Sequence, residues 1–99
     1  MILMSDDLTR AFTLWLGHLA NERRLSAKTV EAYGRDVRQF LAHRTSAQGR
    51  LTSLSDLESL KPVDLRAFMA ARRADDIGSR SLMRGLAGIR SFLRFLERN

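Results

Sequence analysis

The chain has 99 residues, with 17 Lys or Arg against 11 Asp or Glu, and a formal net charge of +6. This length suits one small domain, and 44% hydrophobic with 28% charged residues exclude a wholly disordered chain. The lack of cysteine excludes disulfides and thiolate metal sites, and no apolar run approaches the length of a membrane span. Residues 1–4 are apolar but acids follow them, unlike a secretory signal, so we expect a cytoplasmic protein.

The first predicted helix begins after Ser5, a favourable N-cap that two acids follow, and runs to about Glu22. Its apolar stripe has helical spacing and comprises Leu8, Phe12, Trp15, Leu16 and Leu19. Within this stripe, Trp15 is expected in the core rather than on a base-stacking surface. His18 lies at the edge of the stripe without other residues at ligand spacing, which favours a structural role over metal binding.

The second predicted helix begins after Ser26 and runs to about Arg44. Its apolar side comprises Val30, Tyr33, Val37, Phe40 and Leu41. Its opposite side carries Lys28, Arg35, Arg38 and Gln39. Tyr33 lies at the centre of the apolar side, so we expect a core residue and not a nucleophile, while Asp36 lies at the edge. The basic side fits either a solvated surface or contact with DNA, and this helix alone does not decide between them.

Residues 45–60 form the longest stretch without helical periodicity, and we expect them to join two halves of one domain. Gly49 is a predicted turn, and residues 55–58 (SDLE) have the spacing of a capping box, which predicts a short helical turn. Pro62 suits the first turn of a third predicted helix, which ends near Asp75 and Asp76. Gly78 follows as a predicted left-handed cap.

The last predicted helix, residues 79–98, separates apolar side chains from arginines when its residues are placed about 100° apart. The apolar stripe comprises Leu82, Leu86, Ile89, Leu93 and Leu96. The opposite side carries Arg80, Arg84, Arg90, Arg94 and Arg98, together with Ser91. Like charges at i,i+4 spacing repel, so the pattern indicates a polyanionic partner. Gly85 and Gly88 permit close approach of another helix or of a DNA backbone, and helix packing is the favoured use.

The sequence offers no constellation for catalysis. His18 and His43 stand apart from other metal-ligating residues, and neither a phosphate-binding glycine loop nor a nucleophile with a paired base is present. We therefore expect no enzymatic activity from this chain, no metal and no cofactor. The positive pattern is a pair of amphipathic helices, the second and the fourth, each with a basic outer side that could meet a DNA groove.

Two segments resemble a known family. LSAKTVEAYGRDVRQFL, residues 25–41, resembles the "LS..T...Y..DL..FL" motif in the N-terminal core-binding (SAM-like) domain of tyrosine recombinases. SRSLMRGLAGIRSFLRFL, residues 79–96, resembles the last helix of that domain, commonly "S..T..R.LSALRSF..FL". The first helix also matches, so the resemblance covers nearly the whole chain. Within the family, the XerC/XerD group of chromosome-dimer resolvases is the nearest match, with the XerC type favoured.

The resemblance implies a compact all-α bundle of four main helices, SAM-like in fold, that spans residues 1–99 as a single DNA-binding domain. It implies that the second and fourth helices clamp a double-stranded recombination half-site, while the catalytic residues lie in a separate C-terminal domain that this chain lacks. The motif positions expected near DNA are Thr29, Arg35, Ser81, Arg84 and Arg90. The helical pattern adds Lys28, Arg38, Gln39, Arg80 and Ser91.

The expected partners are DNA and, through the full-length protein, sister recombinase subunits, at the nucleoid in the cytoplasm. The isolated domain is expected to be a monomer. Two other functions fit the residues: a stand-alone helical DNA-binding regulator, and a helical protein–protein adaptor whose basic side meets an acidic partner. Binding that weakens with salt separates the DNA functions from docking on an apolar surface.

Overall fold

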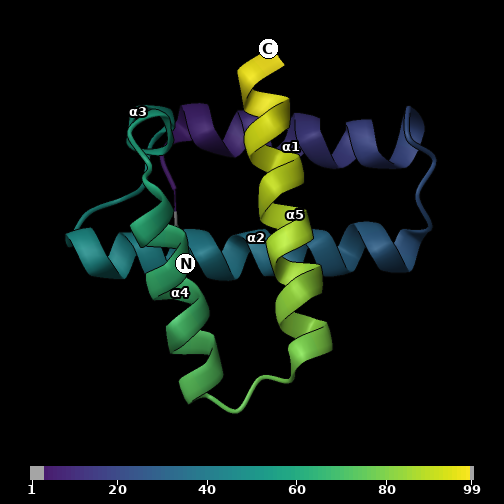
Figure 1. The fold of residues 1–99 in the computed structure, drawn as a ribbon. Coiled ribbons are helices and arrows are strands. Elements are labelled where there is room, and N and C mark those ends of the chain that lie inside the picture. Colours follow the sequence, from purple (N-terminus) through teal and green to yellow (C-terminus); the bar gives the residue numbers. More distant parts are fainter. Residues whose placement is uncertain (1–3, 99) are drawn as a thin grey trace.

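The computed structural model describes residues 4–98 and contains five helices within them. In chain order these are α1 (Asp6–Asn21), α2 (Ala27–Gln48), α3 (Leu54–Glu58), α4 (Pro62–Ala74) and α5 (Ser79–Arg98). The antiparallel helices α1 and α2 lie side by side, α5 crosses both of them, and a loop joins α5 to α4 (Figure 1). The predicted all-α bundle of four main helices is confirmed, with α3 as an additional short helix.

Of the apolar start at residues 1–4, only Met4 lies within the described range, and residues 1–3 and 99 lie outside it. Met4 is buried, and the N–H of Ser5 donates to the carbonyl of Thr52 at 2.9 Å. These contacts tie the start of the described chain to the segment between α2 and α3. Among the helices of residues 4–98, none has the length and apolar content of a bilayer-spanning segment.

The first two helices begin at the predicted caps. Ser5 Oγ accepts a hydrogen bond from the N–H of Leu8, and Ser26 Oγ accepts one from the N–H of Thr29. α2 continues beyond the predicted end at Arg44, because the helix stops only at Gly49, which has a left-handed backbone with φ of 73°. Gly49 is therefore the predicted turn, and it also sets the length of α2.

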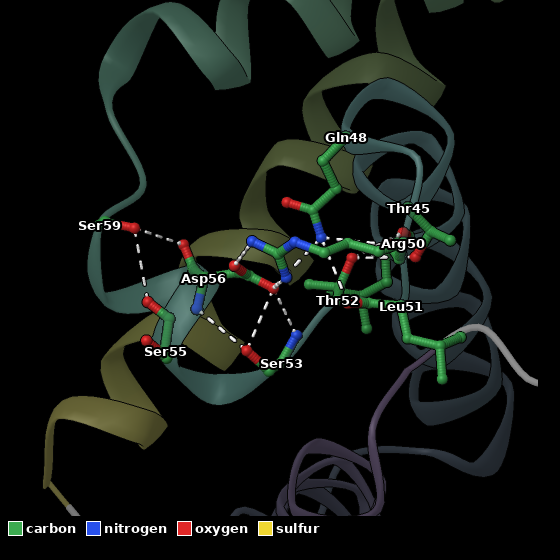
Figure 2. A network of polar contacts seen from close by, with 10 residues as sticks. Thr45, Gln48, Arg50, Leu51, Thr52, Ser53, Ser55, Asp56 and Ser59 are labelled. Atoms are coloured by element: carbon green, nitrogen blue, oxygen red, sulfur yellow. Dashed lines mark hydrogen bonds and ion pairs between the residues drawn. The ribbon is translucent and has the colours of Figure 1, made fainter.

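Helix α3 begins earlier than the predicted capping box at residues 55–58. The N-cap is Ser53, whose Oγ accepts from the N–H of Asp56 while the Asp56 carboxylate accepts from the N–H of Ser53. Arg50 favours this register because its guanidinium donates to both oxygens of that carboxylate, at 2.8 and 2.7 Å (Figure 2). Hydrogen bonds from Arg50 stabilise the charged form and hold the pKa of Asp56 well below its usual range.

The left-handed residue between α4 and α5 is Asp76, with φ of 61°, and not the predicted Gly78. Aspartate tolerates this conformation because its short polar side chain can hydrogen-bond locally. The N–H of Asp75 donates to the carbonyl of Ala71 and ends α4. Gly78 instead lies directly before α5, and its carbonyl accepts the N–H of Leu82 at 3.0 Å.

Three aromatic rings from α1 and α5 form the centre of the core. Trp15 is fully buried, and its ring centroid lies 5.1 Å from that of Phe92. Phe12 meets the same ring edge-on, with the centroids 5.9 Å apart. The core placement predicted for Trp15 is confirmed. Phe92 lies outside the predicted apolar stripe of the last helix, so the buried side of α5 is turned further toward Phe92 than the leucines alone indicate.

Two glycines bring α5 close to α2. A Cβ at Gly88 would lie 3.4 Å from Cγ and 3.6 Å from Cα of Tyr33. A Cβ at Gly85 would lie 3.8 Å from Cγ of Asp36. Both glycines therefore serve helix packing, the use favoured from the sequence. Tyr33 packs against the core as predicted.

Candidate nucleic-acid interface

The outward side of α5 is a row of exposed side chains at i+3 and i+4 spacing, which comprises Arg80, Met83, Ala87, Arg90, Arg94 and Arg98. We call this row the arginine face. Within residues 4–98, none of its four arginines lies within ion-pair distance of a carboxylate. Arg90, Arg94 and Arg98 follow one another at i,i+4 spacing, where like charges repel, and Glu97 is the acid of α5 beside them.

Arg84 differs from the other arginines of α5 because it makes an ion pair inside the bundle. Its Nε donates to Oδ2 of Asp36 at 2.8 Å, and its Nη2 donates to Oδ1 at 3.1 Å. The arginine side chain is 39% exposed, whereas that of the aspartate is 6% exposed. Hydrogen bonds to the carboxylate raise the pKa of Arg84, which therefore stays cationic.

The pairing of Asp36 with Arg84 is the contact that the sequence did not predict. Asp36 is buried at the crossing of α2 and α5, and not at the edge of a solvated side. The Asp36–Arg84 pair could have been inferred from Gly88 and Phe92, which belong to the buried side of α5. They place that buried side closer to Arg84 than to Arg90. Arg84, which the sequence predicts to contact DNA, therefore lies at the border of the core.

The candidate residues of α2 occupy several environments. Lys28, Arg35 and Arg38 are exposed, and the guanidinium carbon of Arg38 lies 5.1 Å from the ring centre of Phe12. That contact places Arg38 on the α1 side of α2, away from the α5 crossing. Thr29 is half-buried, and its Oγ1 accepts a hydrogen bond from the Ser26 hydroxyl at 2.9 Å. Thr29 therefore takes part in the N-cap of α2.

Three half-buried polar candidates lie where α5 meets the other helices. Gln39 and Ser81 line one small hollow, together with Asp36 and Arg72. Ser91 lies further along α5, and its Oγ accepts a hydrogen bond from Nε1 of Trp15 at 3.1 Å. The structure therefore brings Gln39 and Ser81 together near the Asp36–Arg84 pair, and it ties Ser91 to the aromatic core.

An open hollow lies between the C-terminal ends of α1 and α5, lined by His18, Glu22, Arg23, Ser91, Arg94, Phe95 and Arg98. His18 is hydrogen-bonded to Glu22, and its ring centroid lies 5.3 Å from that of Phe95. These contacts give His18 the structural role predicted for it. In the described part of the chain, no group of three or more His, Cys, Asp or Glu side chains could hold a metal ion.

Comparison with known proteins identifies a family for most of the chain. Residues 12–99 match the family described as "Phage integrase, N-terminal SAM-like domain". A tyrosine recombinase XerC from Methylobacterium sp. (strain 4-46) is 62% identical over 92 residues, which cover 93% of this chain and 28% of that protein. The XerC of Nitrobacter winogradskyi is 56% identical over 94 residues, covering 95% of this chain and 29% of that protein.

A third relative, the XerC of Rhizobium meliloti, is 59% identical over 85 residues, covering 86% of this chain and 27% of that protein. The chain thus spans less than a third of the length of these recombinases. No solved structure matches the chain.

Proposed function

The chain belongs to the family of phage-integrase N-terminal SAM-like domains, and we propose that it is the core-binding domain of a XerC-type tyrosine recombinase, which binds double-stranded DNA. In this proposal, the domain clamps one recombination half-site with α2 and α5. Strand cleavage belongs to a separate catalytic domain and to the sister subunits with which the full-length protein assembles. The domain itself supplies no catalytic residue and acts as a monomer at the nucleoid.

The arginine face is the observation that supports this proposal most strongly. Four arginines without acidic partners in the described chain project from one side of a single helix. Arginine presents a planar set of donors that fits phosphate and guanine edges, and an α-helix fits the major groove of B-DNA. A DNA duplex would place phosphates against these side chains and remove their mutual repulsion.

The candidate residues divide into two kinds of contact. The exposed arginines of α5 and the exposed basic side chains of α2 suit phosphates, which position the protein on the duplex. Arg84 is held by its ion pair near the α2–α5 crossing and suits a contact that depends on geometry, and the half-buried Gln39 and Ser81 lie close by.

A fluorescence-anisotropy titration with a Xer-type half-site duplex and a scrambled duplex tests the proposal. The test variant is Arg90→Ala with Arg94→Ala, which removes two charges from the arginine face. The matched control is Arg10→Ala with Arg66→Ala, which removes two exposed arginines from α1 and α4. We expect the test variant to bind both duplexes at least tenfold more weakly than the control, since each lost phosphate contact reduces counterion release.

Equal binding by the two double variants would refute the arginine face as the DNA contact. Binding of the wild-type domain to neither duplex at low salt would remove DNA binding as its function and favour a protein partner with an acidic surface. Binding without any preference for the half-site would keep the DNA contact and leave the sequence preference to the rest of the recombinase.

A further inference from the structure

Asp36 is a buried acid beneath a surface proposed to bind a polyanion. Only 5% of the residue is exposed, and its carboxylate contacts Arg84 through both oxygens. A carboxylate so close to DNA phosphates would weaken binding by repulsion if it did nothing else. Its ion pair with Arg84 offsets this charge and is a contact that an uncharged residue could not make.

The geometry of the pair leaves one edge of the guanidinium free. Nε and Nη2 of Arg84 both donate to the carboxylate, which is the side-on arrangement of an arginine and an acid. A guanidinium has about five N–H donors, so about three remain, on Nη1 and Nη2. These donors form the end-on edge of the same plane, and one N–H from each nitrogen can reach a second pair of acceptors.

The two partners are buried to different degrees. The aspartate side chain is 6% exposed and lies on the inner side, whereas the arginine side chain is 39% exposed. Gly85, the next residue on α5, packs against Asp36 with space for little more than a methyl group. The carboxylate is thus held in the helix crossing, while part of the Arg84 side chain stays exposed.

We propose that Asp36 is a positioning residue, which fixes the Arg84 guanidinium so that its end-on edge binds one pair of hydrogen-bond acceptors on DNA. The pair is either O6 and N7 of a guanine or two oxygens of one phosphate, because both accept a planar fork of donors. This inference rests on the proposed DNA-binding function. A guanidinium already fixed loses less conformational freedom on binding than a mobile one, which increases affinity.

The test compares Asp36→Asn with Asp64→Asn in the same half-site and scrambled-duplex titrations. Asp64 is also ion-paired, to Arg44 at 3.5 Å, but it lies on α4. Both changes add one positive charge, so electrostatics alone predicts equal or tighter binding to both duplexes. We expect that result for Asp64→Asn. For Asp36→Asn we expect half-site binding about tenfold weaker, in the range that one bidentate contact contributes.

Arg84→Lys is the second variant, because lysine keeps the charge but cannot make a planar fork. It should lose as much half-site affinity as Asp36→Asn, and combining the two changes should cost little more than either alone. Arg66→Lys is its control, since Arg66 is exposed on α4 outside the arginine face and has no carboxylate partner in the described chain, and it should bind nearly as the wild type does. Thermal unfolding of each variant confirms that the folded domain is being compared.

The two acceptor pairs are distinguished by modified duplexes. If the acceptor is a guanine, replacing one guanine by 7-deazaguanine weakens wild-type binding but not binding by Arg84→Lys, and the half-site preference falls. If the acceptor is a phosphate, replacing that phosphate by a methylphosphonate linkage weakens wild-type binding to both duplexes but does not weaken binding by Arg84→Lys.

Folded Asp36→Asn or Arg84→Lys that binds the half-site as tightly as the wild type would overturn the positioning role while leaving the proposed function intact. If the wild type itself binds no duplex, the proposed function fails, and the inference fails with it.

Discussion

Trp15 donates a hydrogen bond from Nε1 to Oγ of Ser91 at 3.1 Å, which joins the centre of the core to the edge of α5 that carries the candidate DNA contacts. Trp15 is fully buried, whereas Ser91 is half-buried. The bond therefore satisfies a buried indole N–H and at the same time fixes how far α5 is rotated about its own axis. The position of the arginine face depends on that rotation.

Ser91→Ala should destabilise the domain by about 1–3 kcal/mol, because it leaves the buried N–H of Trp15 without an acceptor. Ser81→Ala, a half-buried serine on the same helix, should change the free energy of unfolding by less than about 0.5 kcal/mol. Urea unfolding of both variants measures the difference. Equal stability of the two variants would show that water replaces the serine hydroxyl.

Substitutions at Gly85 and Gly88 of α5 should change the free energy of unfolding in opposite directions. Gly85→Ala should stabilise the domain by up to about 1 kcal/mol, since the added Cβ would lie 3.8 Å from Asp36 and alanine favours the helix. Gly88→Leu should destabilise it by about 1–3 kcal/mol, because Tyr33 leaves no space for a larger side chain. Thermal unfolding measures both, and a Gly88→Leu variant as stable as the wild type would contradict the close packing of α2 and α5.

The Asp56 network should make stability depend on acid pH. The pKa of Asp56 is held well below its usual range in the folded state, so its contribution is fully present above the unfolded-state pKa of about 4. That contribution is lost as the pH falls below about 4 toward the folded-state pKa. Asp56→Asn should therefore flatten the fall in stability between about pH 5 and pH 2, measured by urea unfolding.

Asp75→Asn serves as the control for that experiment, because Asp75 is exposed and makes no ion pair within the described residues. It should keep the pH dependence of the wild type. If Asp56→Asn also keeps it, the bonds from Arg50 and Ser53 do not persist in solution.

Features that depend on residues close in sequence were predictable. Helical periodicity placed Trp15 in the core and arginines on the outer side of α5, because both follow from spacing along one helix. Local cap chemistry predicted Ser5, Ser26 and Gly49 correctly. The capping box at Ser53 was missed because two serines have acids at the same spacing, and only the distant contact from Arg50 distinguishes them.

Contacts between helices were not predictable from the same patterns. The Asp36–Arg84 pair depends on where α2 and α5 cross, which in turn depends on Gly88 and Phe92 at the interface. A helical projection centred on the leucines of α5 does not show where α5 crosses α2. The left-handed conformation of Asp76 is a similar case, since glycine at position 78 was the better candidate by intrinsic preference alone.

The salt dependence of half-site binding tests the central claim most directly. If about five basic side chains contact phosphates, a plot of log K against log salt concentration should have a slope near −4 to −5. Arg90→Ala with Arg94→Ala should bring that slope about 2 units closer to zero, since each contact contributes about 0.9. A slope near zero for the wild type, or one that the double variant leaves unchanged, would contradict a DNA-binding role for the arginine face.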